Sequence, residues 1–166
     1  PDLDFNTGAT PGNAGNHVYD NEYAGIVAWG NVLVFGNTVH GHAGSGDVGV
    51  AVYWDAQAQA NVVYDNALGM GGWLGGDVLA NRVFDNGTGI DTDGGRVEQN
   101  QVYSNGVGIH ASNSWAYTGN ILNNVVYDSA QYGIQLERGG NGATVHNNTV
   151  YEPTASALRM ETSSYG

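Results

Sequence analysis

Apolar and polar positions recur along the chain in one repeated block. In its clearest copy, Asn81–Asn86 reads Asn-Arg-Val-Phe-Asp-Asn and leads into Gly89-Ile90. Copies begin at intervals of 21, 24, 20, 19, 24 and 24 residues, counted between Asn16, Asn37, Asn61, Asn81, Asn100, Asn124 and Asn148. A near-constant period of this size indicates a solenoid in which each repeat forms one coil.

Each repeat holds three short apolar runs separated by turn residues, as in Gly25–Trp29, Val32–Phe35 and Thr38–His40. No stretch shows a sustained i, i+3, i+4 pattern, so essentially no helix is expected. The pattern predicts an all-β parallel β-helix of about seven coils of 19–24 residues, with three short strands per coil. We expect residues 16–160 to form it, residues 1–15 to be a leading segment or partial coil, and residues 161–166 to start a further coil or a tail.

The phase of the repeat predicts two buried columns of aliphatic side chains. The first comprises Val18, Val39, Val63, Val83, Val102, Val126 and Val150, and the second Ile26, Val50, Met70, Ile90, Ile109, Ile134 and Leu158. The recurring asparagines are predicted to form ladders at the turns, because an amide side chain can bond both its neighbour and the local backbone.

Composition and charge narrow the function. The chain has 27 glycines, no cysteine and no lysine, four arginines and a net charge of −12. Such a surface repels a polyanion, so nucleic acid is excluded as a partner. No apolar stretch is long enough to span a membrane. The acidic composition and a start at Pro1 rather than methionine favour a processed protein with an extracellular, cell-surface or periplasmic location.

The repeat Asn-x-Val-Tyr-x-Asn followed by Gly-Ile resembles the right-handed parallel β-helix repeats of the pectin-lyase-like superfamily. The resemblance extends over residues 16–160 and implies a right-handed coil. Members include polysaccharide lyases, glycoside hydrolases, uronan epimerases, phage tailspikes and copper-delivery proteins. Because the shared residues are structural, function has to be argued from the outer surface.

Strand alternation places a distinctive set of side chains outward beside the Gly-Ile positions. The set consists of the aromatic line Trp29, Tyr53 and Trp73, followed by Asp91, Asp93, His110 and Glu137. Aromatic faces pack against the C–H faces of sugars, and carboxylates bind hydroxyl groups. The primary hypothesis is therefore a module that binds polysaccharide along the rod. Aromatic residues on adjacent strands can also stack to stabilise a sheet without any ligand.

Asp91, Asp93 and His110 are the candidate catalytic residues of an alternative, enzymatic hypothesis. His110 lies one coil from Asp91, so an imidazole–carboxylate pair could transfer a proton while Arg138 or Arg159 neutralises a uronate carboxyl group, as in a lyase or epimerase. Asp91 and Asp93 could instead act as an acid–base pair, because alternate strand residues lie roughly 7 Å apart, within the range for inverting hydrolases. The absence of lysine excludes lyases that use a lysine base.

Metal binding and assembly complete the expectations. Asp91, Asp93 and Glu137 could hold Ca²⁺ through oxygen ligands, whereas His40 and His42 are expected to be solvated. Neither end shows an amphipathic capping segment, so further coils or another protein chain are expected there. A purely structural stalk or adhesin segment is the second alternative.

Overall fold

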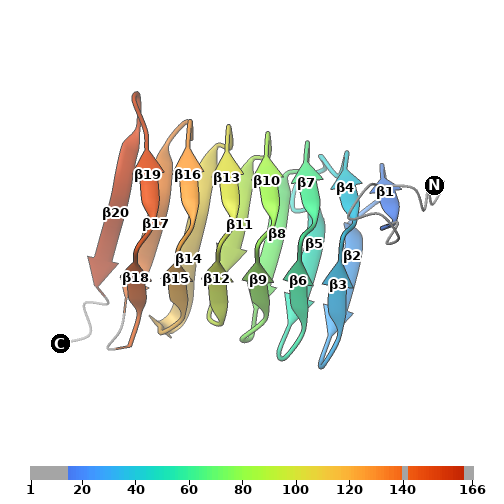
Figure 1. Cartoon of the computed structure of the whole chain (residues 1–166), viewed down its shortest axis with the longest axis horizontal. Helices are drawn as coiled ribbons and strands as arrows, with labels where there is room; N and C mark the ends of the chain where they lie inside the picture. Colours follow the sequence, from blue (N-terminus) through green and yellow to red (C-terminus); the bar gives the residue numbers. More distant parts are fainter. Residues whose placement is uncertain (1–14, 140–141, 163–166) are drawn as a thin grey trace.

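A computed structural model describes residues 15–139 and 142–162, which form a parallel β-helix (Figure 1). Strands of three residues make the first sheet: β1 (His17–Tyr19), β4 (Thr38–His40), β7 (Val62–Tyr64), β10 (Arg82–Phe84), β13 (Gln101–Tyr103), β16 (Val125–Tyr127) and β19 (Thr149–Tyr151). Longer strands make the second: β2 (Ala24–Trp29), β5 (Val48–Tyr53), β8 (Leu68–Trp73), β11 (Thr88–Thr92), β14 (Val107–Tyr117), β17 (Tyr132–Gly139) and β20 (Ser156–Thr162). The third comprises β3 (Leu33–Phe35), β6 (Gln57–Gln59), β9 (Asp77–Leu79), β12 (Arg96–Glu98), β15 (Asn120–Leu122) and β18 (Thr144–His146).

Every strand pairs in parallel with its equivalent in the neighbouring coil, and consecutive strands belong to different sheets. The described residues hold six complete coils, and β19 and β20 begin a seventh. The all-β fold with three short strands per coil is therefore confirmed. The leading segment expected over residues 1–15 lies, except for Gly15, outside the described residues. At the other end β20 continues to Thr162, two residues past the expected boundary at 160.

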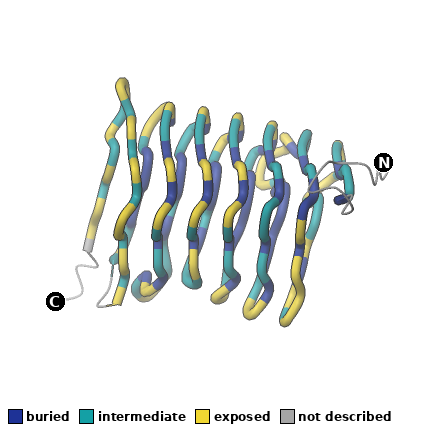
Figure 2. Tube along the Cα trace, in the orientation of Figure 1, coloured by how far each residue is buried: buried dark blue, intermediate teal, exposed yellow. Residues whose placement is uncertain are grey.

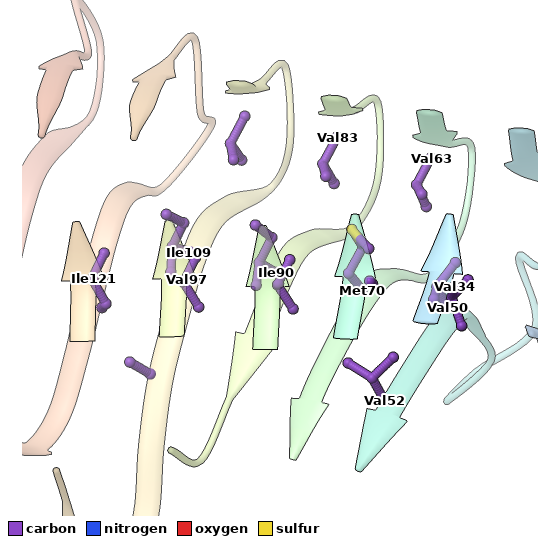
Figure 3. Packing of buried hydrophobic residues seen from close by; sticks show 14 of the residues in the cluster. Val34, Val50, Val52, Val63, Met70, Val83, Ile90, Val97, Ile109 and Ile121 are labelled. Atoms are coloured by element: carbon purple, nitrogen blue, oxygen red, sulfur yellow. The ribbon is translucent and has the colours of Figure 1, made fainter. Parts of the chain in front are cut away.

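Most residues of the predicted aliphatic columns fill the interior (Figure 3), and their backbone positions are coloured as buried in Figure 2, but Ile26 and Val150 are only partly buried. Val63, Val83, Ile90 and Ile109 are fully buried. Leu158 was expected to be buried, but it is 50% exposed because no coil within the described residues covers β20. The columns thus obtain their burial from the coils on both sides, as expected for a solenoid.

A steric constraint explains why glycine precedes isoleucine in each Gly-Ile pair. A Cβ added to Gly69 would lie 2.6 Å from the carbonyl oxygen of Gly89, and a Cβ added to Gly89 would lie 2.6 Å from that of Gly108. Any side chain at these positions would collide with the backbone of the next coil, so the repeat requires glycine here.

The predicted asparagine ladders are confirmed, and Asn81 shows their geometry. Its Oδ1 accepts hydrogen bonds from the backbone N–H of Asn61 at 2.9 Å and from Nδ2 of Asn61 at 3.0 Å. Its own Nδ2 donates to the carbonyl oxygen of Ala58 at 2.9 Å and to Oδ1 of Asn100 at 3.1 Å. Each amide therefore satisfies buried polar groups that the turn would otherwise leave unpaired.

His42 is a rung of the second ladder, and the expectation that it is solvated is wrong. Only 1% of the residue is exposed. Its Nδ1 lies 2.9 Å from Oδ1 of Asn66, and its Nε2 lies 3.2 Å from Nδ2 of Asn21. Because an amide oxygen accepts and an amide nitrogen donates, the proton belongs on Nδ1. His42 thus bridges two asparagines at a position where its repeat lacks one.

Candidate functional site

All four tryptophans of the chain lie on or directly after strands of the second sheet. Trp29 and Trp73 end β2 and β8, Trp54 follows β5, and Trp115 lies within β14. Trp115 is 85% exposed, Trp29 54% and Trp54 48%, while Trp73 is half-buried. Tryptophan is usually well buried, so the exposure of three of the four marks one surface of the rod.

The predicted aromatic line is present. Trp29 and Tyr53 are register partners, and their ring centroids lie 4.5 Å apart in a stacked arrangement. Tyr53 and Trp73 are also partners, with centroids 5.4 Å apart and the rings tilted by 48°. The rings therefore support one another and still present area to solvent, so both ligand contact and sheet stabilisation are compatible with their placement.

Two further residues, Trp54 and Leu74, extend this surface. The strand pattern of the sequence did not predict them. Both are exposed and adopt left-handed backbone conformations, with φ of 58° and 53°. Trp54 packs edge-on against Trp29 at 5.2 Å between centroids. The equivalent turn position of the first coil is Gly30, at φ 72°. The signal in the sequence was a large apolar residue at a turn position that glycine could occupy without strain. Such a residue indicates an exposed side chain with a role of its own.

A groove of about 620 Å³ continues from the aromatic line. It lies between Trp73–Leu74 and Ser112–Trp115, and Asp91, Asp93, Glu137 and Arg138 also line it. The second wall exists because the register of β14 with β17 shifts between Ser112 and Tyr117. The Nδ2 atom of Asn113 donates to the carbonyl oxygen of Asp93 at 2.8 Å and holds this wall against the neighbouring coil.

Asp91 and His110 are register partners on β11 and β14 and form the predicted imidazole–carboxylate pair. The Nδ1 atom of His110 lies 2.6 Å from Oδ1 of Asp91. Oδ2 of Asp91 accepts a hydrogen bond from Nε1 of Trp73 at 2.8 Å. The pKa of His110 is raised, mainly by its hydrogen bond to Asp91 and against the opposing effect of burial.

Glu137 extends the pair into the next coil. Its Oε2 lies 3.8 Å from Nε2 of His110, beyond hydrogen-bonding distance, and its Oε1 accepts from Nε2 of Gln135 at 2.5 Å. Polar side chains thus line up across four neighbouring strands, from Trp73 on β8 to Glu137 on β17. With Nδ1 committed to Asp91, Nε2 is the atom through which His110 could exchange a proton.

Asp93 is placed differently from Asp91. Its Oδ1 accepts a hydrogen bond from the backbone N–H of Leu74 at 2.6 Å, whereas Oδ2 accepts none from the described residues. Burial, with a smaller contribution from the charge of Asp91, raises the pKa of the Asp93 carboxyl group. The two carboxylates are therefore not equivalent, because both oxygens of Asp91 are engaged and one oxygen of Asp93 is available.

The predicted arginines do not converge on the groove. Nη1 of Arg138, at its edge, lies 3.4 Å from the carbonyl oxygen of Ser114. Arg159, on β20, donates to Oε1 of Glu161 at 2.6 Å and to the hydroxyl of Tyr132 at 3.0 Å, and does not line the groove. Of the two, only Arg138 could meet a ligand bound there.

The three predicted calcium ligands do not come together as a metal site. Within residues 15–139 and 142–162, no three His, Cys, Asp or Glu side chains gather in a metal-binding arrangement. The oxygens of Asp91 are directed to Trp73 and His110, and Oε1 of Glu137 is directed to Gln135. The described residues thus hold no preformed cluster of these three side chains, and Ca²⁺ binding by Asp91, Asp93 and Glu137 stays a prediction.

Comparison with known proteins agrees with this architecture. A family model described as a right-handed beta helix region matches residues 75–150. The match covers less than half of the chain, and it agrees with the parallel β-helix that the three continuous sheets form; the pectin-lyase-like superfamily is consistent with both. Searches of curated proteins and of solved structures gave no match. Among the described residues, no helix is long and apolar enough to cross a membrane.

Proposed function

We propose that this protein is a β-helix module that binds a polysaccharide along the outer face of its second sheet. One observation carries the proposal: all four tryptophans lie along this sheet, and the aromatic line runs directly into a polar groove. Trp73 belongs to both parts, since it pairs with Tyr53 and also lines the groove.

The surface has the chemistry and the length that a sugar polymer requires. Indole and phenol rings offer flat apolar faces, and carboxylate, hydroxyl and amide groups in the groove can bond sugar hydroxyls. The aromatic line and groove extend from β2 to β17, five strand spacings or roughly 24 Å along the rod. A linear polymer can therefore contact several coils at once, which favours a chain over a single sugar.

The acidic, lysine-free composition supports a location outside the cytoplasm, in a larger secreted, periplasmic or cell-surface protein. In that setting the module would hold its parent protein on a glycan.

Tryptophan fluorescence provides a direct test, because every tryptophan lies at the proposed surface. Titration with a panel of neutral, anionic and cationic polysaccharides should shift the emission for at least one member. Trp115→Ala and Trp29→Ala should each weaken that binding about tenfold, the typical effect of losing an aromatic contact. Tyr151→Ala removes an exposed aromatic residue of the first sheet and should leave binding unchanged.

If no polysaccharide of the panel binds, the proposal is wrong. It is also wrong if the Tyr151 variant and the tryptophan variants lose the same amount of glycan affinity. In either case the aromatic line would be a device for sheet stability, as the structural hypothesis holds.

A second candidate function is catalysis on the bound glycan, and the 2.6 Å contact between His110 and Asp91 favours it. Asp91 fixes the ring and leaves Nε2 to accept or donate a proton, as a general acid–base residue requires. Asp93, with its raised pKa and one available oxygen, is the carboxyl group better suited to act as an acid in hydrolysis.

This candidate is tested by incubating the protein with the same panel and measuring unsaturated products and new reducing ends. Activity that His110→Gln abolishes while binding persists would establish catalysis by His110. Binding without any product would leave the module as a binding protein only.

A further inference from the structure

We propose that the glycan bound in the groove carries protonated amino groups, as in a polymer with unacetylated glucosamine units. This inference rests on the proposed function and names its class of ligand. The juxtaposition of Asp93 and Glu137 with Trp73 and Trp115 in one groove carries it.

The charges of the groove select the ligand. Asp91, Asp93 and Glu137 line it, against the single guanidinium of Arg138, and the whole chain carries a net charge of −12. A uronan would bring further negative charge into this site and would be repelled. A polycation would be attracted from a distance and stabilised on contact.

The positive groups that an anionic glycan would need are already engaged. Arg96 bonds Asp77 at 2.8 Å, and Arg159 bonds Glu161 at 2.6 Å. Arg82 donates to the hydroxyl of Tyr103 and lies 4.9 Å from the centroid of the Phe84 ring. Arg138 is the fourth and last arginine, and the chain has no lysine. The arginines and lysines therefore cannot offer a set of free cations to the successive carboxylates of an anionic glycan.

An ammonium group finds complementary partners in the same space. Oδ2 of Asp93 accepts no hydrogen bond from the described residues, and Oε2 of Glu137 lies 3.8 Å from Nε2 of His110, beyond hydrogen-bonding distance. Carboxylate oxygens are strong acceptors for N–H donors of a cation. Trp73 and Trp115 line the same groove, and aromatic faces attract ammonium groups.

Burial of Asp93 adds a supporting reason. The raised pKa of this carboxyl group reflects the cost of holding its charge in a partly desolvated place. A bound ammonium group would offset that cost, whereas a neutral hydroxyl would do so less well. The site is therefore set up to bind a cationic sugar more tightly than the acetylated, uncharged form of the same sugar.

The test compares three oligosaccharides of equal length: a glucosamine oligomer, its fully N-acetylated counterpart and a galacturonate oligomer. Calorimetry at low salt should give the strongest binding for the glucosamine oligomer, about tenfold tighter than for the acetylated form. The galacturonate oligomer should bind weakest. Raising the salt concentration should weaken binding of the amine alone, because screening acts on charge pairs.

Isosteric variants locate the effect. Asp93→Asn and Glu137→Gln should each remove most of the preference for the amine, measured as the ratio of the affinities for the glucosamine and the acetylated oligomer. Asp85→Asn is the matched control, because it also removes one negative charge but lies in an exposed turn, at a φ of 54° that asparagine tolerates. It should keep the preference, which separates local contacts from the overall charge.

The outcomes distinguish the inference from the function on which it rests. Equal or tighter binding of the galacturonate or acetylated oligomer would overturn the amine preference and support the proposed function. If Asp85→Asn lost as much of the preference for the amine as Asp93→Asn, the preference would arise from the overall charge and not from contacts in the groove. Failure of all glycans to bind would overturn the proposed function itself.

Discussion

The imidazole of His110 is held by Asp91, one coil away in the β-helix, with 2.6 Å between Nδ1 and Oδ1. Parallel strands in register bring the two residues together even though they are 19 positions apart in the chain. The indole N–H of Trp73, one further coil away, fixes the other carboxylate oxygen. Trp73 of the aromatic line thus positions Asp91, which lines the groove and holds His110.

The His110–Asp91 pair predicts a pH-dependent contribution to stability. The folded-state pKa of His110 is raised above its ordinary value of 6.5, so the folded protein binds this proton more tightly than the unfolded chain. Its contribution is then fully present below about pH 6.5 and is lost as pH rises through the higher folded-state pKa. His110→Gln should therefore lower the melting temperature more at about pH 5.5 than at about pH 9.

Thermal unfolding followed by circular dichroism measures this difference. His146→Gln removes an exposed histidine on β18 and should change the melting temperature little at either pH. A deficit in His110→Gln that is equal at both pH values would show that the imidazole acts by packing alone.

Asp93 also predicts a stability that falls as pH rises, but here the substitution should stabilise the protein rather than destabilise it. Its raised pKa means that the folded state disfavours the charged carboxylate, so stability is lost as pH rises from about 3.8 through the folded-state pKa. Asp93→Asn keeps an oxygen for the N–H of Leu74 and removes the charge, so its melting temperature should exceed that of the wild type at neutral pH.

This advantage should shrink as the pH is lowered toward the ordinary pKa of aspartate, and thermal scans between about pH 4 and pH 7 would follow it. A stabilised variant that also loses glycan affinity would show that Asp93 is retained for binding at a cost in stability. A destabilised Asp93→Asn protein would contradict the prediction.

Gly71 controls the position of Trp73. A Cβ added to Gly71 would lie 2.5–2.7 Å from three atoms of the Trp73 ring. Gly71→Ala should push the ring away and break its hydrogen bond to Asp91, which would lower glycan affinity several-fold with a modest loss of stability. Tryptophan emission, melting temperature and affinity can all be measured on the same protein.

Gly94→Ala provides a matched control, because the nearest atom to its added Cβ, the backbone nitrogen of Gly75, is 3.9 Å away. It should bind glycan like the wild type. Equal affinity in the two alanine variants would show that the Trp73–Asp91 hydrogen bond has no part in binding.

The asparagine ladder should dominate stability. Asn81→Ala leaves the buried backbone N–H and the Nδ2 of Asn61 without their acceptor, and should cost about 3 kcal/mol of unfolding free energy in urea titration. The exposed Asn31→Ala should cost less than about 0.5 kcal/mol. Similar costs for both would mean that water replaces the missing amide at the turn.

The sequence by itself determined the coil, since each short strand recurs at a fixed period and can bury its apolar side chains by pairing with its equivalent in the next repeat. Asn81, Val83, Gly89 and Ile90 could be assigned to turn, core and close backbone approach because each recurs at the same phase. The register that pairs Asp91 with His110 follows from the same count. Local repetition and strand alternation are sufficient for such positions.

Only the tertiary structure decided the features that depart from the repeat. His42 takes an asparagine's place because its two ring nitrogens span the gap between neighbouring amides. Trp115 forms a groove wall because β14 shifts register there, which periodicity cannot anticipate. Arg159 pairs with Glu161 rather than reaching the groove, a choice among side-chain conformers that depends on neighbours in space. Repetition fixes the backbone path, whereas the interactions of individual side chains across coils determine the site.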